Sequence, residues 1–162
     1  MRDATRTTRA ILRRASSIIL LFLLCACDGT LYHSFSTLAG EWQRDSVAEF
    51  VYGSPYLPSA GCAVRVEART DATYRYRSLV VCAGYYNMND SLLACDTIPI
   101  VVYGDDGRRL GATAGILYQQ QSDILFPEVS FRDSVTVRLR HIMPDDTLKG
   151  VHDIGIRLMK RN

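Results

Sequence analysis

Apolar and polar residues alternate with a period of two over much of this chain, which is typical of half-buried β-strands. In residues 63–70, Val64, Val66 and Ala68 alternate with Arg65, Glu67 and Arg69, which predicts that the three charged residues face outward. Residues 135–140 alternate in the same way, and residues 79–83 and 98–103 are nearly continuous apolar runs. Asp105-Asp106-Gly107 supplies a tight turn, since Gly accepts a positive φ and Asp can bond its own backbone. With no sustained helical period, the pattern predicts an all-β protein. We expect roughly seven to nine strands in a single antiparallel β-sandwich, jelly-roll or immunoglobulin-like.

The last two predicted strands can be given a register as a hairpin. Placing residue 141 opposite 152 pairs Leu139 with Ile154, Val137 with Ile156 and Val135 with Leu158, and sets Arg140 opposite Asp153 on the outer face. A slip of one residue would turn the apolar set to solvent. The register leaves the loop from Pro144 to Lys149 exposed and available to a partner.

The first residues follow a different pattern. Basic residues precede an apolar run over 15–24 that ends in Leu24-Cys25-Ala26-Cys27. This run is too short to span a bilayer and has the layout of a secretory signal. Because the small Ala26 precedes Cys27, the pattern is the one that lipoprotein signal peptidase cuts. It predicts a lipoprotein signal peptide over residues 1–26 and lipid attachment at Cys27; the alternative is an ordinary signal peptide cut nearby.

Removal of this leader changes the charge balance. The chain has 19 basic and 17 acidic residues, but the leader contains five of the arginines and Asp3. Residues 27–162 are therefore slightly acidic, with basic residues scattered along them, which argues against nucleic-acid binding. Their length suits one domain. We expect residues 27–162 to form a single lipid-anchored β-sandwich domain.

Three cysteines remain in that domain: Cys62, Cys82 and Cys95. A second hairpin, turning over residues 86–90, sets Cys82 opposite Cys95. Opposed strand residues lie within disulfide range, so in an oxidising compartment this is the pair we would choose. The alternative is three reduced thiols that pack as small apolar groups. No spacing of Cys and His predicts a zinc site.

Candidate chemistry is sparse. The hairpin register makes His141 face His152, with Asp145, Asp146 and Asp153 nearby, a set that could hold a metal ion. Both histidines, however, continue inward apolar series, where a packed, hydrogen-bonded histidine is commoner, so we predict no metal site and no cofactor. Ser34 beside His33 lacks the pattern of an activated nucleophile. We predict that the protein is not an enzyme.

Tyrosines are frequent at predicted strand ends and in loops: Tyr52, Tyr56, Tyr74, Tyr76, Tyr85 and Tyr86. Such rings could stack on sugars, although tyrosine is also a favoured strand residue. A lipid-anchored carbohydrate-binding module is therefore the alternative function. Trp42, the only tryptophan, is predicted to pack near the start of the sandwich and not in a ligand site.

Several segments, in order and spacing, resemble the gliding-motility lipoprotein GldH family of the Bacteroidota. They are residues 32–35 (YHSF), 41–47 (EWQRDSV) with Phe50, 69–74 (RTDATY) with Leu79 and Val81, 96–98 (DTI) with Gly107 and Gly111, Phe126-Pro127, 140–143 (RHIM) and 148–157 (LKGVHDIGIR). The resemblance implies a non-enzymatic envelope lipoprotein that supports gliding motility and the associated type IX secretion machinery. It implies protein partners in that apparatus and attachment to a membrane, expected to be the outer membrane.

Overall fold

The computed structural model describes residues 29–53, 62–129 and 134–161. The predicted signal peptide (1–26), Cys27 and Tyr56 lie outside these residues. Within the described ranges no helix is long and apolar enough to cross a membrane. The regular elements there are nine strands: β1 (Thr30–Gln43), β2 (Ala48–Tyr52), β3 (Cys62–Thr70), β4 (Ser78–Tyr86), β5 (Leu92–Val101), β6 (Ala112–Ala114), β7 (Leu117–Gln121), β8 (Val135–His141) and β9 (Thr147–Lys160).

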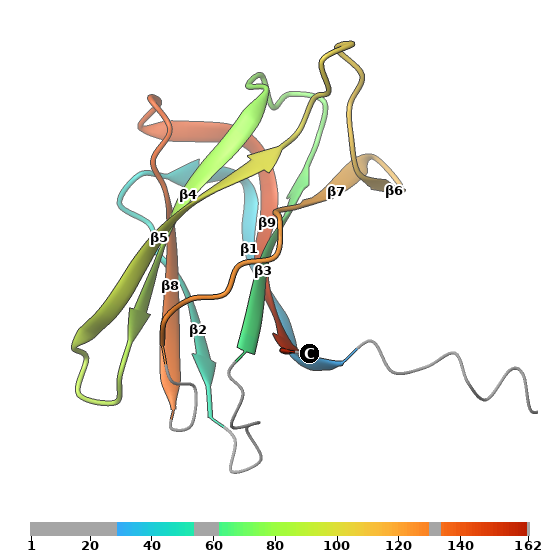
Figure 1. Cartoon of the computed structure of the whole chain (residues 1–162). Helices are drawn as coiled ribbons and strands as arrows, with labels where there is room; N and C mark the ends of the chain where they lie inside the picture. The colour runs from blue at the N-terminus through green and yellow to red at the C-terminus, as the bar shows by residue number, and fades with distance from the viewer. Residues whose placement is uncertain (1–28, 54–61, 130–133, 162) are drawn as a thin grey trace, which may run out of the picture.

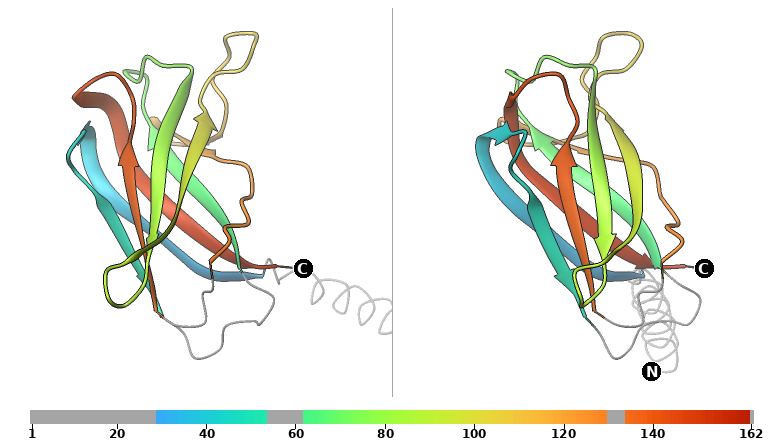
Figure 2. Two further views of the ribbon diagram at one scale, coloured as in Figure 1. Left: turned by 60° about the vertical axis from the view of Figure 1, so that its left-hand side comes forward. Right: turned by 90° about the vertical axis from the view of Figure 1, so that its left-hand side faces the viewer.

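The strands form two sheets that pack face to face (Figures 1 and 2). The five-stranded sheet has the order β1-β9-β3-β7-β6, and the four-stranded sheet has the order β2-β8-β4-β5. All of the strand pairs within them are antiparallel. The all-β, antiparallel sandwich expected from the alternation is therefore confirmed.

The core lies between the two sheets and is built from alternate residues of each strand. The five-stranded sheet contributes Trp42, Val64, Val66, Ala68, Ile154, Ile156 and Leu158, and the four-stranded sheet contributes Phe50, Leu79, Val81, Ile98, Ile100, Val137 and Leu139. These side chains are at most 3% exposed. Burial of apolar surface on this scale is the main force that holds the sheets together.

The predicted register of the last two strands is wrong. β8 pairs with β2 and β4, whereas β9 pairs with β1 and β3, so the two strands belong to different sheets. The inward residues were identified correctly, because Leu139 and Ile154 are both fully buried. An alternating strand buries one face in the same way whether its neighbour lies beside it or across the core. Consequently Arg140 lies opposite Cys82 and does not face Asp153.

The connection between β8 and β9 is shorter than predicted. β9 begins at Thr147, and the side chains of Met143 and Leu148 are buried in the core. Pro144, Asp146 and Lys149 are exposed. The loop expected to be open from Pro144 to Lys149 is therefore exposed only in part.

The predicted hairpin between β4 and β5 is present, but its register differs by two residues. Cys82 lies opposite Thr97, and Gly84 lies opposite Cys95. The turn occupies residues 87–91, where the Asn87 side chain accepts hydrogen bonds from the backbone N–H groups of Asn89 and Ser91. An irregularity in the pairing between Tyr85 and Tyr86 shifts the register further. A shift of two residues keeps Cys82 and Cys95 on the same face of the sheet, as diagonal neighbours.

Aromatic contacts join the two sheets at both ends of the sandwich. At the end where β1 begins, which we call the Gly29 end, the rings of Tyr32 and Tyr52 lie 5.5 Å apart. At the opposite end, Trp42 meets His141 at 5.3 Å. The β4–β5 turn lies at the Gly29 end, together with the end of β9 (Figure 2).

Candidate functional site

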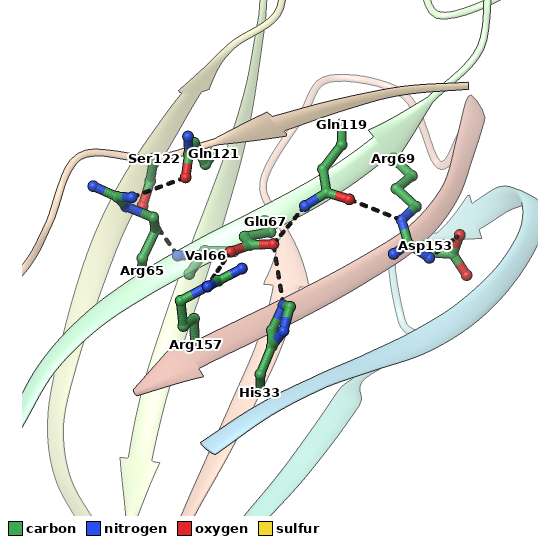
Figure 3. A network of polar contacts seen from close by, with 10 residues as sticks. All are labelled: His33, Arg65, Val66, Glu67, Arg69, Gln119, Gln121, Ser122, Asp153 and Arg157. Carbon is green, nitrogen blue, oxygen red and sulfur yellow. Dashed lines mark hydrogen bonds and ion pairs between the residues drawn. The ribbon is translucent and has the colours of Figure 1, made fainter. Parts of the chain in front are cut away.

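Neighbouring polar side chains on the outer face of the five-stranded sheet make up a group that we call the Glu67 network (Figure 3). It consists of His33 on β1, Arg65, Glu67 and Arg69 on β3, Gln119 and Gln121 on β7, and Asp153 and Arg157 on β9. Antiparallel pairing places these residues on one face, since Arg65 lies opposite Arg157 and Arg69 lies opposite both Asp153 and Gln119. Four strands therefore contribute to a single surface.

Glu67 is at the centre of the network and has an exposed fraction of 0%, although it points away from the core. Its Oε1 accepts a hydrogen bond from Arg157 Nε at 2.7 Å. Its Oε2 accepts from Gln119 Nε2 at 2.8 Å and lies 3.2 Å from His33 Nε2. A buried carboxylate is stable only with such partners. The three side chains thus replace water around both oxygens of the Glu67 carboxylate.

Close packing over Gly155 makes this burial possible. Gly155 lies opposite both Glu67 and Phe35, and the Phe35 ring occupies the space above it. A Cβ at residue 155 would come within 2.5 Å of that ring. Because glycine has no side chain, Gly155 leaves room for the phenyl ring of Phe35 to pack against the sheet beside Glu67.

Arg69 connects Phe35 to the rest of the network. Its guanidinium lies 4.0 Å from the centre of the Phe35 ring, and its Nε donates to Gln119 at 3.2 Å. Asp153 is 3.7 Å from Arg69 and accepts a hydrogen bond from the Thr37 hydroxyl at 3.0 Å. Arg69 and Asp153 are thus each held by more than one neighbour, which restricts the positions that they can take.

The chemistry of the network favours binding. Both oxygens of Glu67 are engaged, so the carboxylate is not placed to take a proton from a substrate. Three arginines stand against two carboxylates, so the surface has a net positive charge. Arginine and aromatic side chains are enriched at protein interfaces. An arginine-rich surface beside Phe35 suits recognition of a protein partner.

The two histidines considered as metal ligands are not brought together. His141 lies in the four-stranded sheet, where its Nε2–H donates to the Trp42 carbonyl at 3.1 Å, and burial lowers its pKa. His152 lies in β9, 2.7 Å from Asp71. Among the described residues no group of three or more His, Cys, Asp or Glu side chains is arranged to hold a metal ion.

Asp71 follows β3 at the end of the sandwich opposite to the Gly29 end, and its carboxylate holds the turn there through hydrogen bonds. It accepts hydrogen bonds from the N–H and the hydroxyl of Thr73 and from His152. Burial raises the pKa of its carboxyl, but these hydrogen bonds and the charge of His152 outweigh burial and lower the pKa to about 2. Asp71 thereby ties the turn after β3 to β9.

Cys82 and Cys95 meet on the outer face of the four-stranded sheet. Their Sγ atoms are 2.9 Å apart and both thiols are free, as is the buried Cys62. The hydrogen bond with Cys82 is the main reason that the pKa of Cys95 rises to about 11. The contact occurs without the direct opposition that we predicted. The Cys82–Cys95 disulfide stays a prediction.

The tyrosines do not form an exposed stacking surface within the part of the chain that the structure describes. Tyr52, Tyr74 and Tyr85 are buried, and Tyr76 and Tyr86 are partly buried. Trp42 is fully buried, and its Nε1–H donates to the Ser46 carbonyl at 3.0 Å, which confirms a packing role. The buried rings of Tyr52, Tyr74 and Tyr85 cannot stack on a sugar, so they give the carbohydrate-binding alternative no support.

Sequence reasoning placed Arg65, Glu67 and Arg69 correctly on the outer face but did not identify Glu67 as a buried centre. The partners of Glu67 lie 34, 52 and 90 positions away along the chain. No local pattern marks such an arrangement. The one available signal was the charged residue at every second position of β3, at Arg65, Glu67 and Arg69, which allows charge pairs with neighbouring strands.

Comparison with known proteins gives one family. A family model described as GldH lipoprotein matches residues 30–158, which include the whole of the Glu67 network. No curated protein matches the chain. The resemblance inferred from the sequence segments is thus confirmed, and a membrane-anchored location in the cell envelope follows from the family.

Proposed function

Because the chain belongs to the GldH lipoprotein family, we propose that it is a non-enzymatic envelope lipoprotein that supports gliding motility and the associated type IX secretion machinery. We place it at the outer membrane, held by lipid on Cys27 after removal of residues 1–26. The family match supports the lipoprotein character, and the Leu24-Cys25-Ala26-Cys27 pattern supports the attachment point.

The Glu67 network is the surface through which the protein binds a component of this machinery. The observation that carries the proposal is a fully buried carboxylate on the outside of a sheet, held by side chains from three other strands. Such an arrangement costs desolvation energy that an apolar side chain would avoid. It fixes the positions of Arg69 and Arg157 at the surface, which prepares them for a partner without further ordering.

The segments that carry the family resemblance meet on this surface. Residues 32–35 supply His33 and Phe35, residues 69–74 supply Arg69, and residues 148–157 supply Asp153 and Arg157. These three segments are far apart in the chain and become neighbours only through the pairing of β1, β9 and β3. This convergence supports the outer face of the five-stranded sheet as the working surface.

A charge reversal on each sheet tests the proposal. Arg65 donates to Gln121 at the edge of the network, so Arg65→Glu changes the charge of this surface while leaving Glu67 and its three partners in place. Arg140→Glu is the matched control, because Arg140 is exposed on the outer face of the four-stranded sheet. Each variant replaces the native copy in the bacterium that encodes the protein.

Colony spreading and the amount of type IX cargo in the medium are then measured, with protein abundance followed by immunoblot. We expect Arg65→Glu to lose function at normal abundance and Arg140→Glu to behave as the parent. Normal motility and secretion in Arg65→Glu, or equal loss in both variants, would contradict the assignment of this surface. Unimpaired spreading and secretion after deletion of the whole gene would contradict the proposed function itself.

A further inference from the structure

We propose that the Gly29 end of the sandwich rests directly on the lipid bilayer, with the β4–β5 turn inserted into the headgroup region beside the acyl chains. This inference rests on the proposed lipid attachment at Cys27. It adds a second membrane contact, made by the folded domain itself, and it fixes the orientation of the sandwich relative to the membrane.

The length of chain before the domain sets the distance from the bilayer. Cys27 precedes Gly29 by two residues, which can span at most about 7 Å. Gly29 is tied to the end of β9, because its carbonyl accepts a hydrogen bond from the Lys160 N–H at 2.8 Å. The lipid must therefore lie close to this end of both β1 and β9, and the domain has no tether that would let it stand away from the membrane.

Large apolar side chains are exposed at the same end. In the β4–β5 turn and the start of β5, the exposed fractions are 77% for Met88, 56% for Leu92 and 46% for Leu93. Phe126 is 54% exposed, and its ring lies 5.0 Å from the guanidinium of Arg161, the residue that follows β9. Figure 2 shows the β4–β5 turn at the level where β1 begins and β9 ends. Apolar side chains presented beside a lipid anchor suit the interface of a bilayer.

Basic side chains at this end suit an anionic lipid surface, although the exposed Glu128 lies near Met88 and Leu93. Lys160 and Arg161 are exposed next to Gly29, and basic residues near a membrane are attracted to anionic headgroups. Asp90 is the acidic residue of the β4–β5 turn, and it is neutralised by Arg138 at 2.7 Å. Contact with the membrane therefore brings no unpaired carboxylate of this turn into the headgroup region.

The opposite end has a different character. Its turns carry the ion pairs Arg44–Asp146 and Arg75–Asp145, at 2.9 and 2.7 Å, and the pair Arg77–Asp105. Arg75, Asp145 and Lys149 also line an open hollow of about 260 Å³ there. Val47 and Ile142 are also exposed in these turns, at 49% and 45%, so it is the three ion pairs of its turns that distinguish this end from the Gly29 end and suit it to water.

Two tryptophan substitutions at equally exposed positions test the orientation. Met88→Trp places an indole at the proposed insertion point, and Ile116→Trp places one between β6 and β7, where Ile116 is 79% exposed. Trp42, the only native tryptophan, is buried at the opposite end and gives a constant background. The mature acylated proteins, which begin at Cys27, are reconstituted into vesicles of phosphatidylethanolamine and phosphatidylglycerol, with or without bromine on the acyl chains.

We expect the added indole of Met88→Trp to emit at shorter wavelength when the protein is bound to vesicles, and to be quenched when the acyl chains carry bromine. The Ile116→Trp protein should be quenched by bromine no more than the parent. Protein that floats with the vesicles without quenching of Met88→Trp, or with equal quenching of both variants, would overturn the proposed orientation and leave the lipoprotein function intact. Protein that does not float with the vesicles would overturn both the orientation and the anchoring at Cys27.

Discussion

The contact between Glu67 and Arg157 gives the most specific energetic prediction. Arg157→Met keeps much of the side-chain volume but removes the Nε–H that donates to Glu67 Oε1 at 2.7 Å. The Glu67 side chain is 1% exposed and that of Arg157 is 26% exposed, so water cannot fully replace the lost donor. The carboxylate would be left with Gln119 and His33 as its partners.

The expected loss in unfolding free energy is about 2 kcal/mol. Removing one partner of a fully buried ion pair costs about 3 to 5 kcal/mol, and a single hydrogen bond to a charged group contributes about 1.5 to 3 kcal/mol. Because two partners of Glu67 remain and Arg157 is partly exposed, we expect the loss to fall in the second of these ranges. Adding Glu67→Met to Arg157→Met should restore part of the loss, since no buried charge is then left without its partner.

Arg138→Met is the matched control for this prediction. Arg138 pairs with both Glu49 and Asp90, at 2.8 and 2.7 Å, and the three side chains are 31%, 48% and 68% exposed. Solvent screens both contacts, so its replacement should cost about 1 kcal/mol. Urea denaturation followed by the fluorescence of Trp42 measures both variants. A loss for Arg157→Met no larger than that for Arg138→Met would refute the view that Glu67 depends on its network.

Three further predictions follow from the core and from one carboxylate. Trp42→Ala should lower the unfolding free energy by roughly 3 kcal/mol, because the buried ring leaves a cavity; an unchanged urea midpoint would refute this. Ile154→Asp should prevent folding by burying an unpaired charge, and a native circular dichroism spectrum would contradict it. Asp71 has a pKa of about 2 in the folded protein against 3.8 as an ordinary carboxyl, so its contribution is complete above about pH 4 and is lost as the pH falls toward 2. Urea denaturation at each pH should show that the unfolding free energy falls by about 2 kcal/mol less in Asp71→Asn than in the parent between about pH 4 and pH 2. Parallel pH curves for the two proteins would rule the linkage out.

The alternation of residues was sufficient to predict the strands and their inward faces. Residues 63–70 and 135–140 were assigned correctly because a half-buried strand repeats every two residues, and this signal is local. The turn at Asp105-Asp106-Gly107 was also readable, since Gly107 has a φ of +75°. What decides these features is contained within a few consecutive residues.

Strand pairing was not determined by the same pattern. β8 and β9 both alternate, and Leu139 and Ile154 are both buried, yet the strands belong to different sheets. The short segment from Ile142 to Asp146 carries the chain across the core, and no residue in it distinguishes a crossing from a hairpin turn. The pairing depends on the contacts of β9 with β1 and β3, which come from the other end of the chain.

The candidate site was predictable only in its parts. Arg65, Glu67 and Arg69 were placed on an outer face, but the burial of Glu67 depends on Phe35 packing against Gly155 and on partners from three other strands. For Cys82 and Cys95 the contact was predicted correctly, although the register that produces it was not. The two residues share the predicted face, although a turn that lies one residue later and an irregularity in the pairing between Tyr85 and Tyr86 moved the register by two positions.

The mass of the mature N-terminal peptide tests the account of this protein as a lipid-anchored envelope component most directly. The protein is purified from membranes of the bacterium that encodes it, digested, and analysed by mass spectrometry. The account predicts a peptide that begins at Cys27 and carries acyl chains, and it predicts that Cys27→Ser abolishes this modification and the recovery of the protein with membranes after a high-salt wash. A mature chain that begins at another residue, or an unmodified Cys27 in protein that still fractionates with membranes, would contradict it.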